Sequence, residues 1–129
     1  MNESEMFKIM VCVEAYIKAL YHADSVAMET LFHPEARYIN TNEDGYVNYS
    51  RSDYIGILKD RNPPSATQSS LSEKIISLHL GGNTLAFVEL SLVMMERQYL
   101  DFLTFTKWHG EWVIMNKAFS FTPTNVTTY

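Results

Sequence analysis

The sequence is poor in cysteine, in positive charge and in long apolar runs, and each shortage excludes a class of protein. Cys12 is the only cysteine among 129 residues, so a disulfide within the chain is impossible and a cytoplasmic location is expected. The net charge of −5 argues against a nucleic-acid partner, because proteins that bind along phosphates are normally basic. No apolar run approaches the roughly 20 residues of a membrane-spanning helix, so no membrane partner is expected.

Common catalytic motifs are also missing. The sequence has no glycine-rich phosphate loop, no Cys or His pair at the spacing of metal ligands, and no Gly-x-Ser-x-Gly nucleophile motif. We therefore expect no metal and no cofactor. Apolar residues make up 47% and charged residues 19%, which is typical of a globular chain, and the length predicts one domain over residues 1–129.

The order of the periodic segments predicts an α+β fold. Helical patterns cover residues 3–23, a short segment after Asp24-Ser25, and the stretch that Ser50 would cap. Strand patterns cover residues 36–41, 46–49, 72–80 and 84–96, and a hairpin follows. A long, curved antiparallel sheet wrapped around three N-terminal helices would form a cone-shaped fold with a central pocket.

The hairpin between Tyr99 and Phe121 decides which side chains can face that pocket. Its two strands meet at His109-Gly110, a pair that suits a two-residue turn. Uninterrupted pairing back from Trp108 and Glu111 gives two faces. The first face, expected to line the pocket, carries Phe102, Thr104, Thr106, Val113, Met115, Lys117 and Phe119. The second carries Asp101, Leu103, Phe105, Lys107, Trp112, Ile114, Asn116 and Ala118. Because this second face is largely apolar, we expect a homodimer through Leu103, Phe105, Trp112 and Ile114.

Three segments carry a family resemblance: residues 16–36 (YIKALYHADSVAMETLFHPEA), 50–58, and 101–117 (DFLTFTKWHGEWVIMNK). Together they make the sequence similar to the nuclear transport factor 2-like superfamily, and within it to the SnoaL-like and "putative lumazine-binding" group. The resemblance implies a cystatin-like α+β cone with its pocket at the wide end, commonly paired through the outer face of the sheet. Some relatives are enzymes and others only bind or assemble, so the fold alone does not assign a function.

The resemblance also suggests roles for individual residues. Along the ketosteroid isomerases, Tyr16 falls where a helix tyrosine donates to the oxyanion of the substrate. Asn40 falls where those enzymes have their aspartate base, and an amide cannot take up a proton at neutral pH. The second acid of the isomerases falls near residues 102–104, where the face expected to be inward has no carboxylate. Steroid isomerisation is therefore not expected.

The resemblance also turns Phe87 and Glu89 of the long strand inward, opposite Lys117. A buried ion pair between Glu89 and Lys117 follows, because a charge among aromatic rings needs a partner. The pair could serve as an acid or base with Tyr16, it could anchor a carbonyl or carboxylate of a ligand, or it could be a structural salt bridge. The expected pocket lining is Tyr16, Tyr38, Asn40, Tyr54, Phe87, Glu89, Phe102, Thr104, Met115, Lys117 and Phe119.

Two functions remain open at this point. In the first, the cone binds a small aromatic or alicyclic metabolite, with or without isomerase, dehydratase or cyclase-like acid–base activity. In the second, the chain is a non-catalytic binding or assembly domain with a vestigial pocket. An accessible polar pocket favours the first, and a pocket collapsed onto Phe and Met side chains favours the second.

Overall fold

The computed structural model describes residues 2–67 and 69–124 and contains three α-helices, two 3-10 helices and six strands. The helices are α1 (Asn2–His22), α2 (Ser25–Leu31) and α3 (Arg51–Lys59), with the 3-10 helices η1 (Glu43–Gly45) and η2 (Pro64–Thr67). The strands are β1 (Phe32–Asn40), β2 (Val47–Ser50), β3 (Ser72–Leu80), β4 (Leu85–Met94), β5 (Arg97–Trp108) and β6 (Glu111–Pro123). Among the described residues, no helix is both long and apolar enough to span a membrane.

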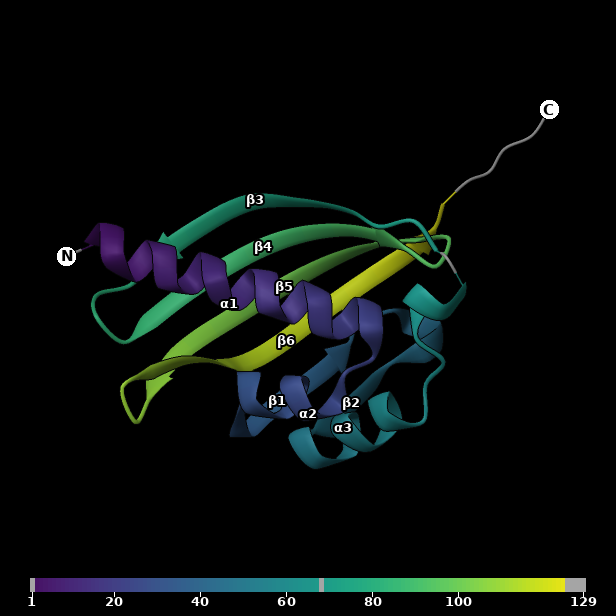
Figure 1. The fold of residues 1–129 in the computed structure, drawn as a ribbon, viewed down its shortest axis with the longest axis horizontal. Coiled ribbons are helices and arrows are strands. Elements are labelled where there is room, and N and C mark those ends of the chain that lie inside the picture. Colours follow the sequence, from purple (N-terminus) through teal and green to yellow (C-terminus); the bar gives the residue numbers. More distant parts are fainter. Residues whose placement is uncertain (1, 68, 125–129) are drawn as a thin grey trace.

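The strands form one curved sheet in the order β2-β1-β6-β5-β4-β3. Figure 1 shows α1 crossing the concave side of this sheet, with α2 and α3 grouped near β1 and β2. The predicted α+β cone with three helices is confirmed. The sheet is mixed, however, and not wholly antiparallel, because β1 and β6 pair in parallel. After β2 the chain passes through α3 and η2 to the far edge of the sheet, and its return brings β6 alongside β1 in the same direction.

Local sequence signals set the helix starts. The Asp24 carboxylate accepts a hydrogen bond from the backbone N–H of Ala27 at the start of α2. The Ser50 hydroxyl accepts one from the N–H of Asp53 at the start of α3. Each side chain satisfies an N–H that has no partner within its helix. Both caps are at the positions that the sequence predicted.

The β5–β6 hairpin turns at His109 and Gly110, whose φ angles of 52° and 80° give the predicted two-residue turn. Trp108 pairs with Glu111 and Thr106 with Val113, as expected. The register then shifts, because Phe105 pairs with Ile114 while Thr104 pairs with Asn116. Met115 is therefore an extra residue in β6, the arrangement of a β-bulge.

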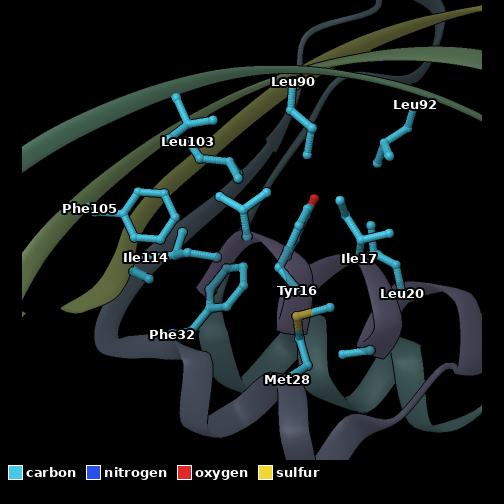
Figure 2. Close-up of a cluster of buried hydrophobic side chains, with 14 of the residues drawn as sticks. Tyr16, Ile17, Leu20, Met28, Phe32, Leu90, Leu92, Leu103, Phe105 and Ile114 are labelled. Atoms are coloured by element: carbon cyan, nitrogen blue, oxygen red, sulfur yellow. The ribbon is translucent and has the colours of Figure 1, made fainter. Parts of the chain in front are cut away.

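The bulge changes which side of β6 faces inward. Trp112 and Ile114 before it, and Lys117 and Phe119 after it, are all buried. The prediction that Leu103, Phe105, Trp112 and Ile114 form an outer face is wrong, because they belong to the core beneath α1. Figure 2 shows Leu103, Phe105 and Ile114 directed toward Tyr16 of α1 and Phe32 of β1. The uninterrupted alternation assumed from the sequence cannot hold across an inserted residue.

Polar contacts join the first turns of α1 to the hairpin. The Trp112 Nε1–H donates to the Glu5 carboxylate at 2.9 Å, and Lys107 Nζ lies 2.7 Å from the same oxygen. These hydrogen bonds, from Lys107 first and then Trp112, lower the pKa of Glu5 to about 2. They fix α1 across the concave side of the sheet, and so help to set the position of Tyr16 near the middle of this helix.

Two phenylalanines of β5 test the assignment of faces. Phe105 is 0% exposed in the core, whereas Phe102 is 42% exposed on the opposite face. We expect Phe105→Ala to lower the free energy of unfolding by about 3–5 kcal/mol, because it removes buried surface and leaves a cavity. Phe102→Ala, the matched control, is expected to cost about 1 kcal/mol or less. Urea denaturation measures both, and equal losses would contradict the assignment.

Candidate functional site

A cavity of about 400 Å³ lies at the end of the cone away from the hairpin turn, between the concave face of the sheet and the segment after α3. Its polar and charged lining consists of Asn40, Arg61, Arg97, Asp101 and Lys117. Its aromatic lining consists of Tyr38, Tyr99, Phe119 and Phe121, and its aliphatic lining of Leu20, Leu92, Met94 and Met95. The cavity thus combines apolar walls with polar and charged groups, a composition compatible with a small-molecule site.

Strand register brings the inner polar groups together. Lys117 of β6 lies between Tyr38 of β1 and Leu103 of β5. Two residues farther along β6, Phe119 lies between Asn40 of β1 and Asp101 of β5. Paired residues on neighbouring strands point to the same side of a sheet, so Asp101 and Lys117 emerge on the concave face as diagonal neighbours.

Asp101 is the buried acid of the site, with 1% of its surface exposed. The hydroxyl of Tyr16, from α1, donates to its Oδ2 atom at 2.5 Å. Burial raises the pKa of Asp101, while nearby Lys117 and the bond from Tyr16 oppose that rise. Burial first, and then the Asp101 charge, raises the pKa of Tyr16 well above its usual value, so Tyr16 stays protonated and keeps donating.

Lys117 is the buried base of the site, with 5% of its surface exposed. Its Nζ atom lies 4.9–5.3 Å from the ring centroids of Tyr16, Tyr38, Tyr54 and Phe119. These rings offer cation–π attraction in place of hydration. Burial lowers the pKa of Lys117 to about 8, and Asp101 opposes the change. Neither ion pair formed among the described residues joins Lys117 to Asp101, so the two charges act on each other without direct contact.

Tyr54 completes the aromatic enclosure. Its ring stacks on Tyr38 with centroids 4.2 Å apart, and the side chain is fully buried. Within residues 2–67 and 69–124, its hydroxyl has no hydrogen-bond partner. An unpaired buried hydroxyl normally costs free energy.

The arrangement of Asp101, Tyr16 and Lys117 can bind a polar atom of a ligand in more than one way. The lysine donates when charged, and the carboxyl accepts when ionised or donates when protonated. Both groups have pKa values moved by burial in the directions that favour their neutral forms. The part of the chain that the structure describes has no cluster of three His, Cys, Asp or Glu side chains that could hold a metal ion.

The family assignment comes from a model whose description reads "Putative lumazine-binding" and which matches residues 4–120. This match covers most of the chain. The protein belongs to the putative lumazine-binding family.

Solved structures of nuclear transport factor 2-like proteins share the fold of this family member. It resembles a protein of that type and of unknown function from Silicibacter pomeroyi DSS-3, with TM-score 0.83, 21% identity, and coverage of 95% of this chain and 99% of the other. A similar protein from Shewanella baltica OS155 gives TM-score 0.82, 18% identity and coverage of 95% and 98%.

A third similar structure is a ketosteroid isomerase-like protein from Erwinia carotovora atroseptica SCRI1043, with TM-score 0.72, 15% identity and coverage of 92% and 98%. A search of curated protein sequences gives no match. At these identities, likeness to a solved structure establishes the fold alone.

Several of the residues that the sequence predicts for the site lie around the cavity. Lys117, Tyr38, Asn40 and Phe119 line it. Tyr16 reaches it through Asp101, and Tyr54 lies behind Tyr38 against Lys117.

The other predicted residues lie elsewhere. Glu89 and Phe87 are on the opposite face of β4, because Val88 and Leu90 are the buried members of that strand. Glu89 accepts a hydrogen bond from Ser77, and the predicted ion pair with Lys117 is therefore wrong. Phe102 packs against Phe87 on this convex face.

Thr104 and Met115 are half-buried and do not line the cavity. Thr104 pairs with Phe87 across the β4–β5 ladder and so shares its convex face, while Met115 is the extra residue of the bulge. Both placements correct the prediction of an inward position.

Asp101 is the residue that the sequence reasoning missed as a site group. It was assigned outward together with Leu103 and Phe105 and is in fact buried with them. The signal was present, since an acid that alternates with bulky apolar residues on one strand face indicates a buried, functional or paired carboxylate. Arg61 and Arg97, which also line the cavity, were not predicted as site residues.

Tyr16 and Tyr54 form a matched pair for measuring the buried hydrogen bond. Both are fully buried, but only the Tyr16 hydroxyl has a partner in the described structure. We expect Tyr16→Phe to lower the free energy of unfolding by about 1–3 kcal/mol, because it leaves Asp101 without its donor. Tyr54→Phe should be neutral or slightly stabilising. Chemical denaturation compares them, and a larger loss for Tyr54→Phe would contradict the described contacts.

The lowered pKa of Lys117 predicts that the protein becomes more stable at alkaline pH. Its pKa is about 8 in the folded protein and near the ordinary 10.5 in the unfolded chain, so the unfolded chain holds more protons between these values. The free energy of unfolding should therefore rise between pH 8 and about pH 9.5, by at most about 1.4 kcal/mol per pH unit. Burial raises the pKa of the Cys12 thiol, which opposes part of this rise near pH 9. Above that range the raised pKa values of Tyr16 and Tyr54 also act in the opposite direction.

Thermal denaturation across this pH range checks the effect of Lys117. The rise should disappear in Lys117→Met. It should persist in Lys18→Met, which removes an exposed lysine from α1. A rise of equal size in Lys117→Met would show that another group causes it.

Proposed function

We propose that the protein binds a small organic molecule with a flat, largely apolar body in the cavity next to Asp101 and Lys117. The observation that carries the proposal is the cavity itself: about 400 Å³, with a buried acid and a buried base in its wall. Ligand sites commonly measure about 300–1,000 Å³ and combine apolar walls with a few polar groups. A chamber collapsed onto Phe and Met side chains, as a vestigial pocket would be, does not match this description.

The lining suggests how such a molecule would be held. The rings of Tyr38, Tyr99 and Phe119 offer faces and edges to a planar ligand. Lys117 would donate to a carbonyl or hydroxyl oxygen, and Asp101 would accept from a hydroxyl or ring N–H. The family description names lumazine, a flat heteroaromatic compound, which is a ligand of this general kind.

Binding is better supported than catalysis. The resemblance to ketosteroid isomerases puts Asn40 where those enzymes have their base, and Asn40 lines this cavity as an amide. Isomerase, dehydratase or cyclase-like chemistry would have to use Asp101 or Lys117 as the acid or base, a role suited to groups with shifted pKa values. We therefore limit the proposal to binding.

The cytoplasmic location and the homodimer stay predictions. A dimer through the convex face of the sheet would use Phe87 and Phe102 in place of the four core residues first expected, because these two rings pack together on that face. The non-catalytic assembly domain remains the alternative function, and binding of a small molecule in the cavity would contradict its vestigial pocket.

A neutral fluorescent probe tests binding in the cavity. N-phenyl-1-naphthylamine fluoresces strongly only in apolar surroundings, and we expect saturable enhancement with one site per chain. Met94→Trp should lower the affinity at least about tenfold, because the larger ring fills a wall of the cavity. Val93→Trp places the same ring on the other face of β4 and is the matched control.

The control must leave probe binding within about twofold of the wild type. Far-UV circular dichroism would confirm that both variants are folded. No enhancement with the wild-type protein, or an equal loss in the two variants, would refute binding in this cavity.

A further inference from the structure

The cavity wall carries more positive than negative charge. Arg61, Arg97 and Lys117 line it, and Asp101 is the one acidic residue among the lining residues of the described structure. This excess occurs in a chain whose overall charge is −5. A local reversal of sign inside a cavity concentrates ligands of the opposite charge.

We propose that the ligand of this cavity is an organic carboxylate, with its anionic group bound by Arg61 and Arg97 and its flat body against the aromatic wall. The inference rests on the proposed binding function and specifies the class of ligand. It assigns a binding role to two arginines at the more exposed side of the cavity, away from the buried Asp101 and Tyr16.

Arg97 is oriented without being neutralised. Its guanidinium carbon lies 4.3 Å from the centroid of the Phe121 ring, and its Nη1 atom donates to the Tyr99 hydroxyl at 3.4 Å. Phe121 and Tyr99 both line the cavity. Stacking on a ring holds the planar guanidinium in place and leaves its remaining N–H groups free to bind an anion.

Arg61 follows the C-terminal end of α3, where its backbone N–H donates to the carbonyl of Leu58 at 3.1 Å. Arg61 and Tyr38 both line the cavity, and the Arg61 guanidinium opposes the rise that burial causes in the pKa of Tyr38. Arg61 also helps to lower the pKa of Lys117 by like-charge repulsion. A bound anion would relieve that repulsion between the two cations.

Among the side chains that the structure describes, no acid forms an ion pair with Arg61 or Arg97. Both ion pairs found there use Glu5, which joins Lys8 and Lys107 at the other end of the cone. Asp60 and Glu96 are the sequence neighbours of Arg61 and Arg97, but neither lines the cavity nor forms an ion pair. Asp101 is bonded to Tyr16 and can offset only one of the three cations.

A carboxylate fits these donors better than a compact inorganic anion would. The guanidinium fork is planar and matches the two oxygens of a carboxylate in a bidentate arrangement. The aromatic and aliphatic residues of the lining need an apolar body to cover them, which free phosphate lacks. The combination therefore points to an aromatic or alicyclic acid.

Two probes of similar shape, one anionic and one neutral, test this inference. 2-Naphthoate and 2-naphthamide share one ring system, and each is titrated as a competitor of N-phenyl-1-naphthylamine. We expect 2-naphthoate to compete at least about tenfold better with the wild-type protein, because hydrogen bonds between charged groups contribute about 1.5–3 kcal/mol. Inorganic phosphate, added as a competitor, should not displace N-phenyl-1-naphthylamine.

Substitution of the arginines identifies the groups responsible. Arg61→Gln and Arg97→Gln should each reduce the preference for 2-naphthoate, and the double variant should reduce it to about twofold or less. Arg37→Gln removes an exposed arginine of β1 that does not line the cavity, so it should keep the full preference. The preference is the ratio of the two competitor affinities within one variant, so a general change in probe affinity cancels. Far-UV circular dichroism would confirm that each variant is folded, and probe affinity should stay unchanged in Arg37→Gln.

The outcomes separate this inference from the function on which it depends. If the neutral probe does not bind the wild-type protein, the binding function itself fails. If it binds but the two naphthalene competitors are equal, or if the preference survives in the double variant, the carboxylate inference fails and the binding function stands.

Discussion

The extra residue in β6 is the constraint on which the site depends. An ordinary strand could face the core only with every second residue, and Lys117 would then point away from the side that holds Trp112 and Ile114. With Met115 inserted, the strand presents Trp112 and Ile114 to the core under α1 and, farther along, Lys117 and Phe119 to the cavity. One strand thus serves both the closed apolar end of the cone and its polar end.

Burial of an acid and a base at the polar end has an energetic cost that the surrounding groups offset. Removing Asp101 and Lys117 from water is unfavourable, and well-packed apolar residues would often be at least as stable there. The Tyr16 hydroxyl and the four rings around Lys117 reduce this cost but do not remove it, as the shifted pKa values indicate. A stability argument alone does not account for these two buried groups, whereas the proposed ligand binding would.

The two ends of the cone differ in what they contact. At the hairpin end, Glu5 ties α1 to Trp112 and Lys107, and the interior is filled by side chains such as Phe32 and Phe105. At the other end the charges are not paired within the described chain, and space remains. The related structures share this cone and are themselves described as being of unknown function or only as isomerase-like. The function therefore depends on the residues at the open end more than on the fold.

Much of the architecture is a local property of the sequence. The caps at Asp24 and Ser50, the turn at His109-Gly110 and the third strand at residues 72–80 were all predicted correctly, because each depends on near neighbours in the chain. The order of these elements indicated the cone, and the resemblance to the superfamily agreed with it.

Which side chains meet inside the cone was decided only by the tertiary structure. The bulge at Met115 leaves no clear mark in the sequence, since it arises from strand pairing across the sheet. A one-residue shift changes which residues of β5 share a face with Lys117 and Phe119 of β6. Without the bulge, Asp101 falls on the face opposite these two residues, and it was therefore expected outside. The placement of Glu89 failed because both faces of β4 carry apolar residues, and only packing against α1 selects the inner one. The sequence by itself determined the elements and their order, whereas the contact between Asp101, Tyr16 and Lys117 depends on register between strands far apart in the chain.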